Sequence, residues 1–231
     1  MDSTNIHITS EHVEVLGQSV KGRPIELHLF NGDRGGDPVL IFAGIHGDEP
    51  TSVYCAKELL KVLEAMPSVL QGVPVAIVTV ANPDGLAADT RVNAHGVDLN
   101  RNFPAANWKR ALAHTRYYSG TAPLSEPESR ILYELIGRLK PRRICSIHSI
   151  GQGKQQNNYD GPAKGLAEVM SGYNHYPASP NIGYDTFGSF GSWAGVDGKV
   201  PMITLELPNR QKGEGAWADN REALLAFIRG K

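Results

Sequence analysis

The feature that most constrains the fold is an alternation of short apolar runs with longer amphipathic segments. Four runs have the length and composition of buried strands: Val39–Ala43, Val73–Val80, Arg143–Ile147 and Pro201–Leu205. Helical spacing of apolar residues is found in three segments: one opening at Pro50, one from a Ser125/Glu128 capping box to about Leu139, and one over Ala216–Ile228. This alternation predicts an α/β fold with a mixed, mostly parallel twisted sheet and helices on both faces.

Turn-forming residues help to assign two further segments, a strand and a turn. A short strand is expected over Ile25–Phe30, before the turn Asn31–Asp37, and Asn82–Gly85 (Asn-Pro-Asp-Gly) is a strong turn signal. The 231 residues contain no internal repeat, low-complexity tract or linker-like stretch, so we expect one domain over residues 1–231.

Charge and hydropathy exclude several classes of partner. The chain has 23 Lys and Arg against 24 Asp and Glu, so no global basic field attracts nucleic acid or an anionic membrane. No apolar stretch approaches the length of a membrane span, and Met1–Ser10 lacks the pattern of a signal peptide. Cys55 and Cys145 lie in apolar runs and are expected to be buried free thiols. These observations favour a cytoplasmic protein with no nucleic-acid or membrane partner.

Chemically versatile residues follow three of the apolar runs. His46 and Glu49 come after Val39–Ala43, and His148 and Glu206 come directly after the last two runs. In parallel sheets the ligand crevice lies at the carboxyl ends of the strands, so we expect these four side chains to meet there. Each residue alone has an ordinary interpretation as a surface pair, a hydrogen-bonded histidine or a capping carboxylate. Their coincidence at strand ends favours a shared site.

Two histidines and a carboxylate are the usual protein ligands of a catalytic zinc ion, which keeps a position open for water. His46 and Glu49 lie three apart on a turn bounded by glycine and Pro50, and His148 would complete the set. We therefore expect one Zn²⁺ per chain, bound by these three residues. Glu206 would then act as the general base toward water.

The wider motifs resemble the zinc carboxypeptidase family. The resemblance extends from Gly17 to Glu206, in matching order, over the segments Gly44–Pro50, Asn82–Gly85, Asp98–Pro104, Ser146–His148 and Thr204–Glu206. It implies a single zinc carboxypeptidase-like catalytic domain. It also implies that His46, Glu49 and His148 bind zinc and that Glu206 is the general base.

Other roles are likewise implied by the resemblance. Asp98 would orient the His46 imidazole, as carboxylates commonly do for zinc-ligating histidines. Asn100 and Arg101 would clamp a terminal carboxylate, which a guanidinium fits with two parallel hydrogen bonds. Arg91 would stabilise the oxyanion, and Tyr184, in a Gly-rich segment, would close over the substrate.

Within the family, Gly96–Trp108, Ser125–Glu128 and Gly183–Trp193 resemble the bacterial branch that hydrolyses the γ-D-glutamyl–diaminopimelate bond of recycled cell-wall peptide. That resemblance implies a small murein peptide as substrate, a cytoplasmic location and a homodimer.

Three alternatives remain open at this point. One is another small-substrate zinc amidohydrolase of the same fold, of the aspartoacylase or succinylglutamate desuccinylase type, although Asn82–Gly85 and Gly188–Trp193 favour the carboxypeptidase branch. Another is a carboxypeptidase acting on L-peptides. The third is an inactive binding module on a peptidase scaffold, which would be expected to lack a ligand or the general base.

Overall fold

The computed structural model describes residues 12–209 and 211–230. These residues form one eight-stranded sheet with the strand order β1-β2-β4-β3-β5-β8-β6-β7. The strands are β1 (His12–Gln18), β2 (Pro24–Phe30), β3 (Val39–Ala43), β4 (Val75–Val78), β5 (Arg143–Ile150), β6 (Gln156–Asp160), β7 (Ala178–Ser179) and β8 (Met202–Pro208). The helices are α1 (Pro50–Ala65), α2 (Pro83–Ala88), α3 (Pro127–Leu139), α4 (Lys164–Asn174) and α5 (Gly213–Arg229), with the short turns η1 (Pro67–Leu70), η2 (Leu99–Arg101) and η3 (Gly191–Asp197).

The centre of the sheet is parallel and its edges are mixed. Strands β4, β3, β5 and β8 run parallel, whereas β1, β2 and β6 join antiparallel. The central strands β3 and β4 are fully buried, as expected for strands covered on both faces. The predicted mixed, mostly parallel sheet of an α/β fold is confirmed.

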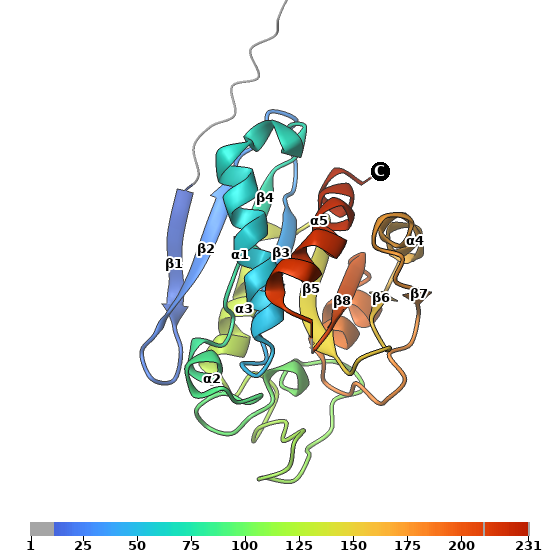
Figure 1. Cartoon of the computed structure of the whole chain (residues 1–231). Coiled ribbons are helices and arrows are strands. Elements are labelled where there is room, and N and C mark those ends of the chain that lie inside the picture. The colour runs from blue at the N-terminus through green and yellow to red at the C-terminus, as the bar shows by residue number, and fades with distance from the viewer. Residues whose placement is uncertain (1–11, 210, 231) are drawn as a thin grey trace, which may run out of the picture.

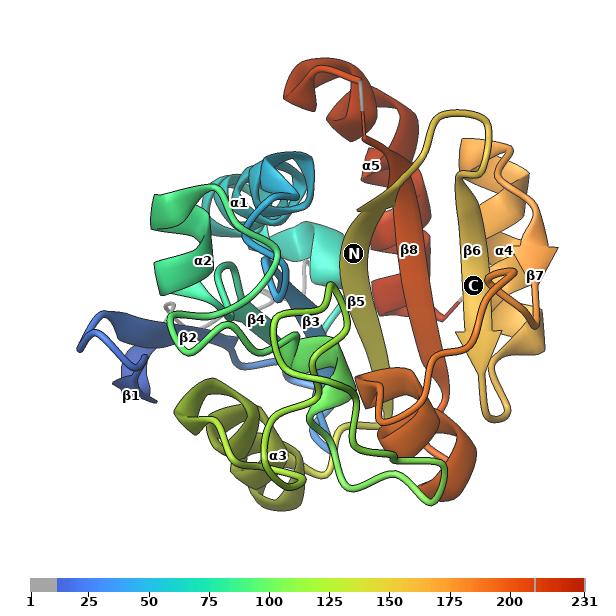
Figure 2. The same cartoon turned by 90° about the horizontal axis from the view of Figure 1, so that it is seen from below.

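Helices cover both faces of the sheet (Figures 1 and 2). Helices α1, α4 and α5 pack on one face around a core that includes Ile41, Leu59 and Phe227. Helix α3 and the π-helical turn η3 pack on the other face around Phe42, Leu132 and Phe190. The loops that follow the parallel strands gather at the lower edge in Figure 1, where the predicted site lies.

Two local predictions are corrected by the structure. Helix α3 has Glu126 as its N-cap, and Glu128 accepts a hydrogen bond from the Val20 backbone N–H instead of closing a capping box with Ser125. The Asn82–Gly85 segment opens the short helix α2, because the Asn82 side chain caps Gly85 N–H and Pro83 occupies the first turn.

The strand ends also differ from the prediction. His148 and Glu206 lie inside β5 and β8, directly opposite each other, because these paired strands extend beyond the apolar runs. Strands β1, β6 and β7 and helix α4 were not anticipated. In β6 the polar sequence Gln-Asn-Asn-Tyr-Asp has no apolar alternation by which a strand could be recognised.

Two other expectations concern cysteines and membranes. Cys55 and Cys145 are free and buried, as predicted. Among the described residues, no helix is long and apolar enough to cross a membrane. The interpretation of Met1–Ser10 concerns residues outside those that the structure describes.

Candidate metal centre and active site

The loop between β3 and α1 carries two of the predicted ligands in a fixed shape. Gly44 turns the chain with a φ of 65°, a left-handed conformation that suits glycine. Gly47 packs so closely on the Gly85 backbone of α2 that a Cβ atom would collide with it. Glu49 is the N-cap residue of α1, with Pro50 in the first turn. The turn geometry and close packing of this loop therefore fix the positions of His46 and Glu49.

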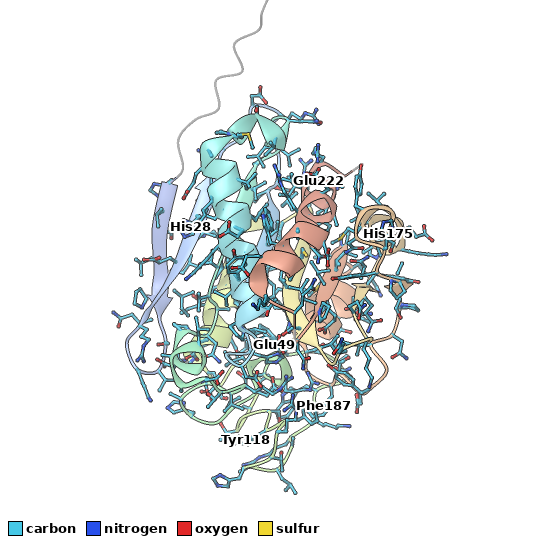
Figure 3. The ribbon with its side chains drawn as sticks, in the orientation of Figure 1. His28, Glu49, Tyr118, His175, Phe187 and Glu222 are labelled. Carbon is cyan, nitrogen blue, oxygen red and sulfur yellow. The ribbon has the colours of Figure 1, made fainter. Side chains whose placement is uncertain are left out.

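The structure brings His46, Glu49 and His148 together at the carboxyl edge of the sheet. One ligand atom from each lies within 4.8 Å of the others, and all three residues are buried. Nδ1 of His46 is 2.8 Å from Oε1 of Glu49, and Nδ1 of His148 is 3.1 Å from Oε2. The Ser149 backbone N–H donates to the same Oε2 and fixes the carboxylate. Figure 3 shows Glu49 at this edge, far from His28 and Glu222.

The hydrogen bonds around His46 fit a bound cation. Its Nε2 faces Oδ1 of Asp98 at 3.1 Å, so a neutral imidazole that donates there keeps a lone pair on Nδ1. That lone pair points at a carboxylate oxygen of Glu49, an arrangement that a divalent cation between the two atoms would stabilise. Zinc bonds of 2.0–2.1 Å in a tetrahedron place ligand atoms about 3.3 Å apart. The two histidine–glutamate separations, 2.8 and 3.1 Å, are close to this value. The donor set therefore fits Zn²⁺.

Asp98 links the histidine to Arg91. The carboxylate is fully buried before η2, and its Oδ2 accepts a hydrogen bond of 2.9 Å from Nε of Arg91. Burial alone would raise the pKa of Asp98, but the charge of Arg91 and the hydrogen bond from His46 outweigh it and hold this pKa well below its usual range. Asp98 is therefore a charged group that fixes two site residues at once. Nη1 of Arg91 also lies 3.6 Å from Glu49 Oε1, so the guanidinium reaches the ligand cluster.

Glu206 lies beside the three candidate ligands and is not part of that group. It pairs with His148 across β5 and β8, and only 3% of its surface is exposed. Burial raises the pKa of Glu206 to about 7, with a further increase from Glu49, while the neighbouring His148 and the positive charge of Arg91 oppose this increase. A carboxylate with such a pKa can both accept and return a proton near neutral pH.

Arg101 and Asn100 come from η2, next to Asp98. Arg101 is 1% exposed, and Nε and Nη2 of its buried guanidinium have no hydrogen-bond partner among the described residues. It packs against the rings of Tyr117 and Phe187, 5.1 and 5.4 Å from their centroids. The Asn100 side-chain oxygen accepts from Phe190 N–H, which fixes the amide at the wall of the site.

One pocket of about 180 Å³ joins these groups. Its lining includes all the predicted site residues except Asp98, which lies directly behind His46. Tyr184 is at the mouth and is 45% exposed. Figure 3 shows Phe187, from the neighbouring segment, at the same edge as Glu49.

Several lining residues were not anticipated from the sequence: Arg116, Tyr117, Ser146, Asn158, Asp160, Thr186, Ser189 and Thr204. Ser146 and Thr204 stand two residues before His148 and Glu206, so the alternation of side chains along a strand could have indicated that they share a face with them. Asn158 and Asp160 lie on β6, a strand that the sequence did not reveal.

Comparisons with known proteins agree with this geometry. A family model described as zinc carboxypeptidase matches residues 6–164. Murein peptide amidase A of Escherichia coli strain K12 is 38% identical over 180 residues, which cover 73% of this chain and 70% of that protein. The Vibrio campbellii protein of the same name is 32% identical over 207 residues, covering 83% of this chain and 77% of that one.

Solved structures give a similar result. The crystal structure of murein-tripeptide amidase MpaA from Escherichia coli O157 matches with a TM-score of 0.76 and 30% identity, covering 99% of this chain and 96% of that chain. Carboxypeptidase A from Helicoverpa armigera has a TM-score of 0.79 at 20% identity, covering 95% and 68% of the two chains, a likeness that concerns the fold alone.

Proposed function

This chain belongs to the zinc carboxypeptidase family, and from that premise we propose that it is a zinc-dependent amidase of murein peptides. Its substrate is the tripeptide L-Ala-γ-D-Glu-meso-diaminopimelate, and the bond it hydrolyses joins D-glutamate to diaminopimelate. Similarity to murein peptide amidase A over most of the chain supports this substrate. A role in peptidoglycan degradation and peptide recycling follows from the same similarity.

The observation that carries the proposal is the buried guanidinium of Arg101 beside the ligand cluster. A buried charge with unpaired nitrogens is costly unless a ligand completes its hydrogen bonds. A carboxylate matches a guanidinium in both shape and charge. An enzyme that removes a carboxyl-terminal residue needs such a group next to its reacting centre, and Arg101 with Asn100 supplies it.

His46, Glu49 and His148 would hold the zinc ion, and Asp98 would keep the His46 ring in the tautomer that binds metal. When bound, zinc lowers the pKa of water and polarises a carbonyl oxygen. The role of Glu206 is to take a proton from the attacking water and to deliver it to the departing amine of diaminopimelate.

Arg91 would stabilise negative charge that develops on the scissile carbonyl oxygen. Its guanidinium is oriented by Asp98, so little reorganisation is needed as the charge develops. Tyr184, at the pocket mouth, would close over the bound peptide. Arg91 and Tyr184 both line the pocket, and Asp98 holds Arg91 in place by a hydrogen bond.

The proposal extends to domain organisation and partners. We propose a single catalytic domain over residues 1–231, with one zinc ion per chain. We place the enzyme in the cytoplasm, as a homodimer, and we expect neither nucleic acid nor a membrane among its partners. The only required partner is the small peptide substrate.

The test is hydrolysis of the purified murein tripeptide, followed as release of free diaminopimelate. Zinc-loaded enzyme should release it, a chelator should stop release, and added zinc should restore it. An L-dipeptide with the same terminal residue serves as the comparison substrate. Faster cleavage of the L-dipeptide would contradict the proposed substrate and favour an ordinary carboxypeptidase. Stoichiometric zinc without turnover of any amide would favour a binding module.

A further inference from the structure

The segment Ser125–Glu128, at the start of α3, carries two buried carboxylates that the proposed function does not use. Glu126 and Glu128 are 4% and 0% exposed. Both accept a hydrogen bond from the same donor, Nδ2 of Asn93, at 2.8 and 3.0 Å. Nδ1 of His95 also lies 2.7 Å from Oε2 of Glu126. Buried carboxylates are costly unless donors satisfy them, so the two glutamates hold the Asn93 side chain in one position.

Asn93 closes the turn that joins Arg91 to Asp98. Its side-chain oxygen accepts from the backbone N–H groups of His95 and Val97, at 3.1 Å each. Its own backbone N–H donates to the Val97 carbonyl oxygen at 2.9 Å. The closed turn brings Arg91 alongside Asp98, which accepts a hydrogen bond from Arg91 Nε. The position of the Arg91 guanidinium therefore depends on an asparagine that α3 holds.

Asn102 makes a second connection to α3, directly after Arg101. Its side-chain oxygen accepts from the Glu126 backbone N–H at 3.2 Å, and its Nδ2 donates to Ser125 Oγ at 3.0 Å. The Arg101 guanidinium itself donates to the adjacent Asn100 carbonyl oxygen, and its Nε and Nη2 have no partner among the described residues. Because so few side-chain hydrogen bonds hold this guanidinium, its position depends on the backbone that Asn102 anchors.

We propose that the start of α3 positions the two pocket arginines through two asparagines, and that each asparagine affects a different step. Asn93 positions Arg91, and Asn102 positions Arg101. Neither asparagine lines the pocket, so both are positioning residues that act through a neighbour. This inference rests on the proposed function, which assigns stabilisation of the scissile carbonyl oxygen to Arg91 and carboxylate binding to Arg101. Asn93 should therefore affect turnover, whereas Asn102 should affect substrate binding.

The experiment measures kcat and KM of the full zinc-loaded enzyme with the murein tripeptide. Asn93→Ala removes the donor that two buried carboxylates share, so the turn that carries Arg91 should shift. A small misplacement of a catalytic group is costly, and kcat should fall by about 10- to 100-fold with KM within about threefold. Asn102→Ala should instead raise KM about tenfold and leave kcat within about threefold.

Two further measurements distinguish positioning from a general loss of stability. In an Arg91→Ala background, Asn93→Ala should lower kcat by less than about threefold, because the group that it positions is absent. Calorimetric titration with free meso-diaminopimelate, which carries the carboxylate that Arg101 would bind, needs no turnover. There Asn102→Ala should weaken binding about tenfold and Asn93→Ala should leave it unchanged.

Glu126→Gln is a milder variant, because it alters the contact with Asn93 and keeps the backbone N–H that donates to Asn102. It should lower kcat by about two- to tenfold without changing KM. Asn220→Ala is the matched control. Asn220 is also a fully buried asparagine with side-chain hydrogen bonds, but it lies on α5 away from the pocket lining. This variant should lower the Tm and leave both kinetic constants unchanged.

Several outcomes would overturn the inference and leave the murein amidase function standing. One is an equal change of kcat and KM in Asn93→Ala and Asn102→Ala; another is an undiminished effect of Asn93→Ala in the Arg91→Ala background. If Asn93→Ala does not fold, an unchanged kcat in Glu126→Gln overturns it. A wild type that cleaves no γ-D-glutamyl bond contradicts the proposed function instead. The same kinetic comparison on an L-dipeptide, with the calorimetric titration, then tests the two asparagines independently.

Discussion

The two sides of the pocket differ in how their charges are satisfied. On the side of the proposed metal site, the metal side, every one of the five side chains contacts another: His46, Glu49, His148, Asp98 and Arg91. On the substrate side, made of Glu206, Arg101 and Asp160, two carboxylates have no hydrogen-bond partner among the described side chains, and Arg101 keeps two nitrogens unpaired.

The side chains on the metal side are fixed by contacts with one another, whereas those on the substrate side have hydrogen bonds that only a ligand can complete. Contacts on the metal side fix the ligand atoms before any substrate arrives, which keeps the cost of reorganisation low. On the substrate side, Arg101 remains unsatisfied until a substrate carboxylate reaches it, and Glu206 until the attacking water supplies a proton. Substitutions on the metal side should therefore lower zinc affinity, whereas substitutions on the substrate side should lower substrate binding or turnover and leave zinc in place.

The largest effect is expected for Glu206→Gln. The amide keeps the shape of the side chain but cannot accept the proton, so kcat should fall by about 100- to 10,000-fold. Zinc content, measured by elemental analysis, should stay at one ion per chain, because Glu206 is not a ligand. A variant that retains activity, or that loses zinc together with activity, would contradict the separation of the two sides.

On the metal side, Asp98→Asn should lower activity by weakening zinc binding. Loss of the carboxylate weakens the orientation of the His46 ring, and such partners typically contribute 10- to 100-fold in metal affinity. Competition with a chelator should show zinc released at a correspondingly lower chelator concentration. Unchanged zinc affinity with reduced kcat would show that Asp98 acts only through Arg91.

Arg101→Lys should change substrate binding with little effect on zinc. Lysine keeps the charge but loses the two parallel hydrogen bonds, so KM should increase about tenfold. A substrate whose terminal carboxylate is replaced by a carboxamide should be cleaved slowly by the wild type and be little affected by the substitution. Equal losses on both substrates would argue against a carboxylate contact.

The smallest effect concerns stability. Because folding raises the pKa of Asp160 from 3.8 to about 6, the folded state holds more protons between these values. The free energy of unfolding contributed by this group therefore decreases as the pH rises from about 4 to about 6. Asp160→Asn removes that cost, so the variant should be more stable than the wild type at pH 7.5, by about 1–2 kcal/mol.

Near pH 3.5 the two proteins should unfold at almost the same temperature. Thermal unfolding over this pH range is the measurement. Glu168→Gln is the control, since Glu168 is exposed on α4 and should show no such dependence. A destabilised Asp160→Asn at neutral pH would mean that the carboxylate has a partner in solution.

Much of the metal side could be predicted from the sequence. His46 and Glu49 lie three apart on a glycine-bounded turn, and His148 follows an apolar run, so local spacing and strand ends were sufficient to group them. Asp98, Asn100 and Arg101 were assigned by resemblance to a family motif, and the structure places them beside the ligands.

The substrate side depended on long-range pairing. Asp160 is on a polar strand with no alternation, and the sequence contained no sign that β6 would pair with β8. The capping-box prediction at Ser125 was wrong for a related reason: Glu128 bonds to Val20, which is 108 residues away in the chain. Local patterns carry no information about which distant group will compete for a side chain.

The sequence by itself therefore determined the α/β class, the parallel centre of the sheet and the grouping of His46, Glu49 and His148, because these depend on periodicity and on residues close to strand ends. The tertiary structure alone decided which strand borders β8 and therefore which polar side chains, Asn158 and Asp160 among them, line the rest of the pocket. The physical reason is that strand pairing and side-chain burial are set by contacts between segments far apart in the chain, and no short stretch of sequence encodes them.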